Sequence, residues 1–262
     1  MSSTIISWNV NGYTPDIHSW LLSFAQTARP SVIFLSETKK KEDVLRTFFN
    51  EFTEYHAIIN PHNPSHYHGV AMLIRKDHSY VHLPLSMNIA CRRDSKDAEA
   101  ATGRVIAIQF NKEMYIIGSY TPNSGQADHI KLAYWTQVWD PCFAKLLEML
   151  RSSGPTLWIG DINVALDDID VSHPVTMQKF AGFTLEERQN LQNLLDQGNW
   201  IDVWRRQHPE ERLYTWRGRA SGMRLDNIIA SKCLLNKVNT TFAVPQQCSS
   251  DHIMIGVSLV NN

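Results

Sequence analysis

The sequence lacks the features of a secreted, membrane-bound or zinc-binding protein. It has no run of about 18 apolar residues, so we expect no transmembrane helix. Its first residues lack the basic and apolar regions of a secretory signal. The four cysteines are far apart and include no CxxC pair, so we expect free thiols in a reducing compartment, either nucleus or cytoplasm. These cysteines are Cys91, Cys142, Cys233 and Cys248.

The chain also lacks an excess of charge of either sign. Its formal net charge is −1, which argues against a protein that coats DNA, because such proteins are strongly basic. A basic cleft on a balanced body is still compatible with this value. Positive residues occur in short groups, although each group alone is equally typical of a solvated surface. The groups are Lys39–Lys41, Arg92–Arg93, Arg205–Arg206, and Arg217 with Arg219.

The sequence is rich in short apolar runs that contain many Val and Ile residues and end at turn residues. Such runs predict strands, several of them covered on both faces. The predicted strands are Thr4–Val10, Ser31–Ser36, Gly69–Arg75, Arg104–Phe110, Met114–Tyr120, Thr156–Ile162, Arg224–Ala230 and His252–Val260. The predicted helices are Pro15–Ala28, Lys41–Phe52, Asp128–Leu150 and Thr184–Leu195. This mixture predicts a layered α/β sandwich, which we expect to form one domain over residues 1–262, with Asp167–Gly182 as a polar loop.

Polar residues of a restricted kind occur at the ends of these strands. Strand ends that converge over a sheet are where α/β folds build active sites. Carboxylate and amide oxygens favour Mg²⁺ or Mn²⁺ over zinc, and a histidine beside a carboxylate suits acid–base chemistry or phosphate binding. One aspartate at a strand end is more often a turn former, so the evidence is the occurrence of six such motifs in order. They contain Asn9 and Asn11; Glu37; Tyr120 and Asn123; Asp161 and Asn163; Asp226; and Asp251 with His252.

These motifs resemble the exonuclease III / AP-endonuclease branch of the endonuclease–exonuclease–phosphatase superfamily. The resemblance extends from Ile6 to about Ser258, and the stretch AGFTLEERQNL at Ala181–Leu191 is specific to this branch. The matching motifs are WNVNG (Trp8–Gly12), SETK (Ser36–Lys39), YTPN (Tyr120–Asn123), GDINVA (Gly160–Ala165), RLD (Arg224–Asp226) and SDH (Ser250–His252). The resemblance implies a DNase I-like, four-layer α/β sandwich in which two mixed β-sheets lie face to face, flanked by helices.

The resemblance also implies a role for each residue. Glu37 is expected to be the principal Mg²⁺ ligand, with Mn²⁺ as a substitute, and Asp161 to orient or deprotonate the attacking water. His252, paired with Asp226, and Tyr120 are expected to contact the phosphate. The expected catalytic set is Tyr120, Asp161, Asn163, Asp226 and His252. The expected metal-binding set is Asn9, Asn11, Glu37, Asp161, Asn163 and Asp251.

The substrate pocket departs from the human-type enzymes of this branch. Trp216 stands where an aromatic wall residue is expected, but Met223 replaces a second tryptophan, and Gln126 replaces an intercalating arginine. Met177 and Phe180 fall where those enzymes carry DNA-contacting asparagines. The turn between Trp216 and Asp226 is short and arginine-rich, as in the endonuclease domains of LINE-type retrotransposons. The expected pocket residues are Lys39, Asn123, Gln126, Trp216 and Met223.

The implied activity is that of an AP endonuclease in base-excision repair. It would act as a monomer on double-stranded DNA, cutting 5′ to abasic sites and trimming 3′-blocked ends. The alternative is a DNA-nicking endonuclease of LINE type with little preference for abasic sites. A catalytically inert DNA-binding relative is disfavoured, because unused metal ligands are costly to bury together.

Overall fold

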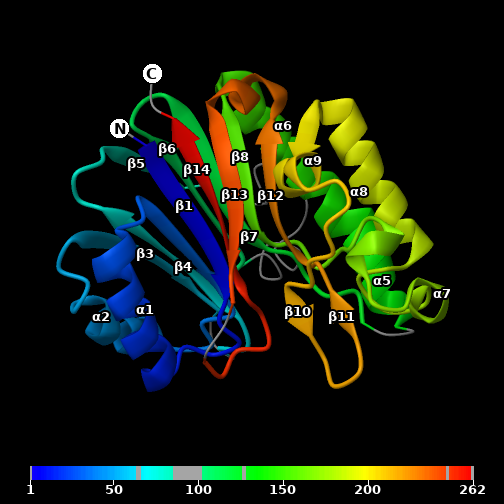
Figure 1. Cartoon of the computed structure of the whole chain (residues 1–262), viewed down its shortest axis with the longest axis horizontal. Helices are drawn as coiled ribbons and strands as arrows, with labels where there is room; N and C mark the ends of the chain where they lie inside the picture. The colour runs from blue at the N-terminus through cyan, green and yellow to red at the C-terminus, as the bar shows by residue number, and fades with distance from the viewer. Residues whose placement is uncertain (1, 63–65, 85–101, 126–127, 246–247, 261–262) are drawn as a thin grey trace.

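Two six-stranded sheets pack face to face in the computed structural model, which describes residues 2–62, 66–84, 102–125, 128–245 and 248–260 (Figure 1). The first sheet has the order β13 (Val238–Val244), β14 (Met254–Val260), β1 (Ser2–Asn9), β2 (Val32–Ser36), β4 (Gly69–Arg75) and β3 (Tyr55–Pro61). The second has the order β5 (Tyr80–Leu83), β6 (Val105–Phe110), β7 (Met114–Tyr120), β8 (Thr156–Asp161), β12 (Asp226–Ser231) and β9 (Trp200–Asp202). Both sheets are mixed, since β1–β2 and β7–β8 are parallel and the other pairs are antiparallel.

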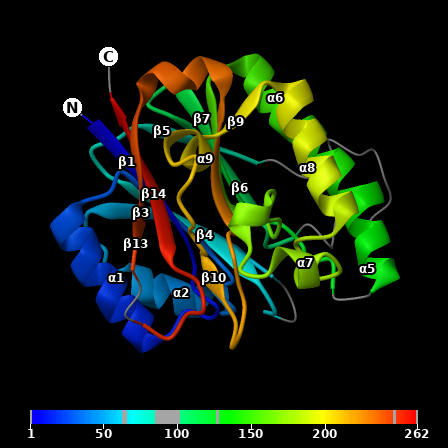
Figure 2. The same cartoon turned by 45° about the vertical axis from the view of Figure 1, so that its right-hand side comes forward.

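Helices cover the outer face of each sheet, which gives four layers (Figure 2). Helices α1 (Pro15–Ala28) and α2 (Glu42–Phe49) pack on the first sheet through Leu21 and Leu45. Helices α6 (Asp140–Ser153) and α8 (Leu185–Gly198) pack on the second sheet through Leu146 and Leu191. The predicted four-layer sandwich is therefore confirmed.

The core between the sheets consists of strand side chains that alternate in and out along each strand. Phe34 of β2 lies so close to Gly118 of β7 that a Cβ added to Gly118 would meet the Phe34 ring at 2.2 Å. The absence of a side chain at Gly118 thus allows the two sheets to approach. The innermost positions include Ile5, Val32, Phe34, Ile108, Ile116, Ile159 and Ile228.

Most predicted elements are found within one or two residues of their expected ends. The capping box of α8 is confirmed, because the Thr184 hydroxyl accepts from the Glu187 N–H and the Glu187 carboxylate accepts from the Thr184 N–H. The prediction of a single regular helix over Asp128–Leu150 is wrong in detail, because this segment contains three helical elements. It consists of α5 (His129–Tyr134), a π-helical turn at Trp135–Trp139, and α6.

Two further expectations need correction. The Asp167–Gly182 loop contains a 3₁₀ turn, Asp168–Asp170, and the short helix α7 (Pro174–Met177). Cys142 is disulfide-bonded, so the expectation of free thiols is wrong for that residue, whereas Cys233 has a free thiol. In the part of the chain that the structure describes, no helix is long and apolar enough to cross a membrane.

A buried ion-pair network anchors the chain beside the second sheet. Arg224, from the RLD motif, is 1% exposed and forms two hydrogen bonds of 2.7 and 2.9 Å to the Asp170 carboxylate. Its guanidinium also donates to Asp202 over 2.7 Å, and its backbone N–H donates to the Asp170 carbonyl over 2.8 Å. Arg205 adds a second cation to Asp170 at 2.6 Å. The arginine of the RLD motif therefore has a structural role, because its ion pairs hold the chain that carries its neighbours Met223 and Leu225.

Removal of the Arg224 charge should destabilise the fold. In Arg224→Met the carboxylates of Asp170 and Asp202 lose their shared partner, and breaking a buried pair in this way costs about 3–5 kcal/mol. Chemical denaturation should show this loss in the free energy of unfolding. Arg46→Met, which breaks the exposed Arg46–Glu42 pair of α2, is the control and should change little. A similar small loss for both variants would contradict the anchoring role of Arg224.

Candidate active site

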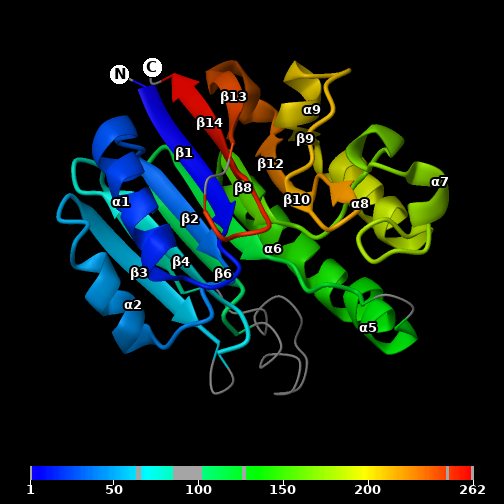
Figure 3. The same ribbon diagram turned by 60° about the horizontal axis from the view of Figure 1, so that its bottom comes forward.

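The strand ends of the two sheets enclose one side of a cavity of about 330 Å³. Its wall combines the loops after β1 and β2 and the ends of β7 and β8 with the loop before β14. A two-stranded hairpin, β10 (Trp216–Arg217) and β11 (Gly222–Met223), also contributes. The hairpin and these strand ends lie along the lower edge of the molecule, which Figure 3 brings forward. The lining residues are Asn11, Glu37, Tyr120, Asn123, Asp161, Asn163, Phe180, Ala181, Trp216, Met223, Leu225, Asp251 and His252.

Asn9 links the two sheets at the floor of this site. Its amide nitrogen donates to Glu37 Oε1 over 2.9 Å, in the first sheet's loop, and to Asp161 Oδ2 over 2.8 Å, at the end of β8 in the second sheet. Its amide oxygen accepts from the Asn11 N–H over 3.0 Å. With its oxygen engaged in this way, Asn9 presents hydrogen-bond donors to both carboxylates and holds them close together.

Glu37 is a partly buried carboxylate in a left-handed backbone conformation, with φ of 53°. Its Oε2 accepts from the Lys39 ammonium at 2.6 Å, and Lys39 also donates to Asn11 Oδ1 over 2.5 Å. Burial raises the pKa of Glu37, but the hydrogen bonds from Lys39 and Asn9 outweigh burial, so that pKa lies below its ordinary value. Glu37 is therefore an anion at neutral pH.

Tyr120, at the end of β7, also donates to Glu37. Burial, reinforced by Glu37 and Asp161, raises the pKa of the Tyr120 phenol well above its ordinary value, so the group keeps its proton. Arg104 lies over the ring, 5.0 Å from its centroid, and donates to the Tyr120 carbonyl over 3.2 Å. The ring of His68 lies nearby, with 6.0 Å between the ring centroids of His68 and Tyr120. Arg104 and His68 lie outside the six sequence motifs, so the sequence alone did not indicate that they belong to the site.

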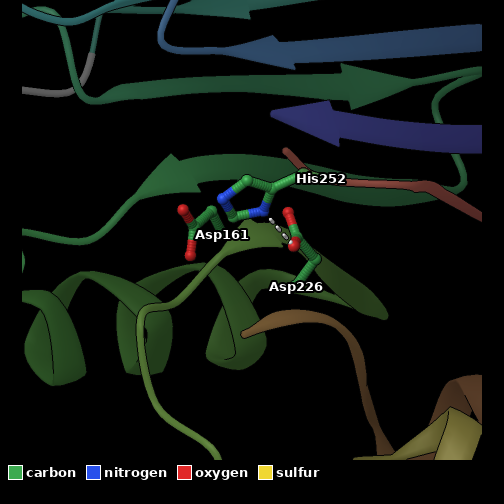
Figure 4. Close-up of side chains that lie close together, drawn as sticks. All are labelled: Asp161, Asp226 and His252. Atoms are coloured by element: carbon green, nitrogen blue, oxygen red, sulfur yellow. Dashed lines mark hydrogen bonds and ion pairs between the residues drawn. The ribbon is translucent and has the colours of Figure 1, made fainter. Parts of the chain in front are cut away.

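His252 lies between two aspartates of the second sheet (Figure 4). Its Nδ1 is 2.7 Å from Asp226 Oδ2. Asp161, Asp226 and His252 each place one potential metal-ligand atom within 4.8 Å of those of the other two. Burial alone would lower the pKa of the imidazole, but the charge of Asp226 outweighs burial and raises that pKa to about 9. His252 is thus an imidazolium at neutral pH, held by a carboxylate from the opposite sheet.

Asp161 is also held by the turn that follows β8. The Asn163 backbone N–H donates to Asp161 Oδ1 over 2.9 Å, with Asn163 in a left-handed conformation. The Asn163 side chain donates to the Thr121 carbonyl and accepts from Asn123 over 3.2 Å. Burial and the nearby Asp226 raise the pKa of Asp161 above its ordinary value. A carboxylate whose pKa approaches neutrality is suited to accept a proton from water.

The composition of the cavity wall fits a hard divalent cation. Glu37, Asp251 and Asn11 present carboxylate and amide oxygens to the same space. Asp226 Oδ1 is buried and has no hydrogen-bond partner among the described residues, so protein donors do not fully compensate the negative charge here. By distance alone, Asp161, Asp226 and His252 are close enough together to hold a metal ion. A metal ion at His252 would have to displace the imidazole proton, whereas Glu37 is already an anion, which favours the Glu37 side of the cavity.

The other side of the cavity has an apolar wall. Trp216 and Phe180 are partly exposed to it, and behind them Met223, 2% exposed, packs with Val171, Met177 and Phe183. Leu225 of the RLD motif and Ala181 of the AGFTLEERQNL stretch complete the wall. Met177, one of the departures from the human-type enzymes, is 2% exposed and packs within this cluster. Gln126 lies outside the described residues.

The protonation of His252 gives a direct test of these electrostatics. In the metal-free protein, ¹⁵N NMR of the imidazole should show titration near pH 9, because Asp226 stabilises the charged form. Asp226→Asn should lower this pKa below the ordinary value of 6.5, because burial then dominates. Asp43→Asn, on the exposed face of α2, should leave it unchanged. Titration of the unaltered protein at or below pH 6.5 would contradict the assignment.

Comparison with known proteins agrees with this geometry. Residues 6–252 match the model of the Endonuclease/Exonuclease/phosphatase family. A DNA-(apurinic or apyrimidinic site) endonuclease of Dictyostelium discoideum is 32% identical over 97% of this chain and 69% of its own. An exodeoxyribonuclease of Bacillus subtilis is 26% identical over 95% of this chain and 96% of its own.

A solved structure shows the same fold. The AP endonuclease from Archaeoglobus fulgidus superposes with a TM-score of 0.82 at 23% identity, covering 97% of this chain and 98% of that one. At this level of identity the likeness concerns the fold alone. With the family match over nearly the whole chain and the six motifs gathered in one cavity, the protein belongs to the endonuclease/exonuclease/phosphatase family, in its exonuclease III / AP-endonuclease branch.

Proposed function

We propose that the protein is a Mg²⁺-dependent DNA phosphodiesterase that cuts the backbone 5′ to abasic sites and trims blocked 3′ ends. The observation that carries this proposal is the arrangement of Asp161 and His252, from different sheets, around one cavity that Glu37 also lines. A proton acceptor, a cation and a metal-ligand carboxylate within one cavity are the groups that phosphodiester hydrolysis requires. The names of the relatives, an abasic-site endonuclease and an exodeoxyribonuclease, support DNA as the substrate.

Glu37, Asn11 and Asp251 would hold the Mg²⁺ ion. When bound, the ion supplies a Lewis acid that offsets the charge developing on the phosphate oxygens. Lys39 already neutralises Glu37 at 2.6 Å, so the ammonium would have to share that carboxylate or move aside. Asn9 and Asn163 would support this arrangement mainly as hydrogen-bond partners, because their amide oxygens accept from neighbouring amide groups. The Asn11 oxygen accepts from Lys39 instead, so movement of that ammonium would release it for the ion.

The residues of the chain can carry the proton transfers of hydrolysis. Asp161 would accept a proton from the attacking water, whose oxygen forms the new bond to phosphorus. His252 and Tyr120 would donate hydrogen bonds to the phosphate oxygens, where negative charge increases in the transition state. The bond from phosphorus to the 3′ oxygen then breaks. The leaving oxygen takes up a proton from solvent to become a 3′ hydroxyl, and Asp161 releases the proton that it accepted to solvent. Asp226 would keep His252 charged and correctly oriented throughout.

The apolar wall suits a small sugar that has lost its base. Flipping a nucleotide out of the duplex costs least where no base is stacked. Trp216 and Phe180 form the exposed part of this wall, beside a cavity of about 330 Å³. We propose that an abasic sugar fits between this wall and the catalytic groups, and that a complete nucleotide fits less well.

Incision should depend on a divalent ion held by Glu37. A labelled duplex with one abasic analogue should be cut with Mg²⁺ or Mn²⁺, and cutting should stop in excess chelator. Glu37→Gln keeps the size of the side chain but removes its charge, so it should raise the Mg²⁺ concentration needed by at least about tenfold. Glu42→Gln, an exposed glutamate on α2, is the matched control. Full activity in chelator would refute the mechanism.

The wall should determine the preference for abasic sites. Phe180→Ala removes part of the wall, so the ratio of kcat/KM on abasic to undamaged duplex should fall by about tenfold, the scale of a pocket contact. Phe24→Ala, a partly buried phenylalanine on α1, controls for loss of stability. Equal kcat/KM on the two duplexes in the unaltered protein would instead favour the LINE-type nicking activity.

A further inference from the structure

Trp216 contacts both sides of the cavity, although its sequence position suggests only a wall residue. Its indole Nε1–H donates to Asp251 Oδ2 over 2.9 Å. The other oxygen of that carboxylate, Oδ1, accepts from the Asn11 side chain over 3.0 Å. Each oxygen of Asp251 therefore has one side-chain donor, and the two donors come from opposite sides of the site.

The backbone next to Trp216 makes this contact rigid. The Arg217 N–H donates to the Asp251 carbonyl over 3.0 Å, and the Ile253 N–H donates to the Thr215 carbonyl over 2.8 Å. Trp216 and His252 face each other in the resulting antiparallel bridge. The strand that carries the wall thus pairs directly with the strand entry that carries Asp251 and His252.

Thr215 extends this connection to Asp226, the partner of His252. Its buried hydroxyl oxygen accepts from the backbone N–H groups of both Leu225 and Asp226, each over 2.9 Å. The three-residue segment Thr215–Arg217 therefore holds the RLD and SDH motifs in register. A movement of the wall would be transmitted to the carboxylates on either side of it.

We propose that Trp216 is a positioning residue that couples the sugar pocket to the metal side of the site. Its ring forms the wall against which the substrate packs, and its N–H fixes the orientation of Asp251. A hydrogen bond to a charged acceptor is stronger than one between neutral groups, so an indole is a firm anchor for a carboxylate. A phenylalanine at this position would keep an aromatic wall but would leave Asp251 Oδ2 without this donor. The inference rests on the proposed function, since it assigns Asp251 to the metal side.

Trp216→Phe tests the coupling, because it removes the N–H while keeping an aromatic ring. Isothermal titration of the DNA-free protein with Mn²⁺ should show affinity weakened about three- to tenfold. The ratio of kcat/KM on abasic to undamaged duplex should change by less than about threefold. Trp20→Phe, a partly buried tryptophan on α1, makes the same chemical change away from the cavity and should alter neither quantity.

A double-mutant cycle distinguishes positioning from a general structural effect. In an Asp251→Ala background, Trp216→Phe should cause no further loss of Mn²⁺ affinity, because the two side chains act through one contact. The indole N–H resonance that Trp216→Phe removes should also shift in Asp251→Asn. Three outcomes would each overturn the inference. They are unchanged Mn²⁺ affinity in Trp216→Phe, additive losses in the cycle, and no measurable Mn²⁺ binding by the unaltered protein. Failure to cut abasic DNA while the cycle holds would overturn the proposed substrate alone.

Discussion

Three carboxylates carried by two different sheets lie near one another at this site, and their mutual repulsion is the constraint on which the site depends. Glu37 belongs to the first sheet, and Asp161 and Asp226 to the second. Like charges in a region of low dielectric repel strongly unless donors or cations lie between them. Asn9 provides two hydrogen bonds, to Glu37 and Asp161, and His252 provides a positive charge beside Asp226. Both Asn9 and His252 come from the first sheet, so the compensation of charge also ties the sheets together.

The surrounding structure keeps these groups in place by means that have no direct part in chemistry. Gly118 allows the sheets to approach closely enough for their strand ends to meet. Arg224 fixes the chain that carries Met223 and Leu225, through its ion pairs with Asp170 and Asp202. The segment Thr215–Arg217 then joins this chain to Asp251 and His252. The apolar wall and the polar site are consequently joined by direct hydrogen bonds and ion pairs.

The sequence was sufficient to predict the strands with strong apolar character and the convergence of their polar ends. It was not sufficient for β3, β5, β9 and β13, which are short, partly exposed or interrupted by polar residues such as Thr240 and Thr241. Their position depends on pairing with neighbours far along the chain. The π-helical turn before α6 is likewise set by packing, because its residues have ordinary helical propensity.

For the site, motif residues could be predicted individually, but their contacts could not. Nothing in the sequence indicates that the Asn9 amide directs its nitrogen toward two carboxylates, or that the arginine of the RLD motif is buried away from the cavity. Arg104 and His68 lie outside the motifs. Arg104 reaches Tyr120 because it precedes β6, which pairs with β7, and His68 does so because it precedes β4 of the facing sheet. The second role of Trp216 depends on a hydrogen bond between residues 35 positions apart.

The central claim is that residues from the two sheets act as one catalytic unit, and a kinetic double-mutant cycle between Asp161 and His252 tests it most directly. Each single substitution, Asp161→Asn and His252→Asn, should lower kcat on an abasic duplex by at least about 10²-fold, the scale usual for acid–base groups. The double variant should lose little more than the worse single variant, because removal of either member disables the unit. A loss in the double variant equal to the product of the two single losses would show that the residues act independently, and would contradict the account.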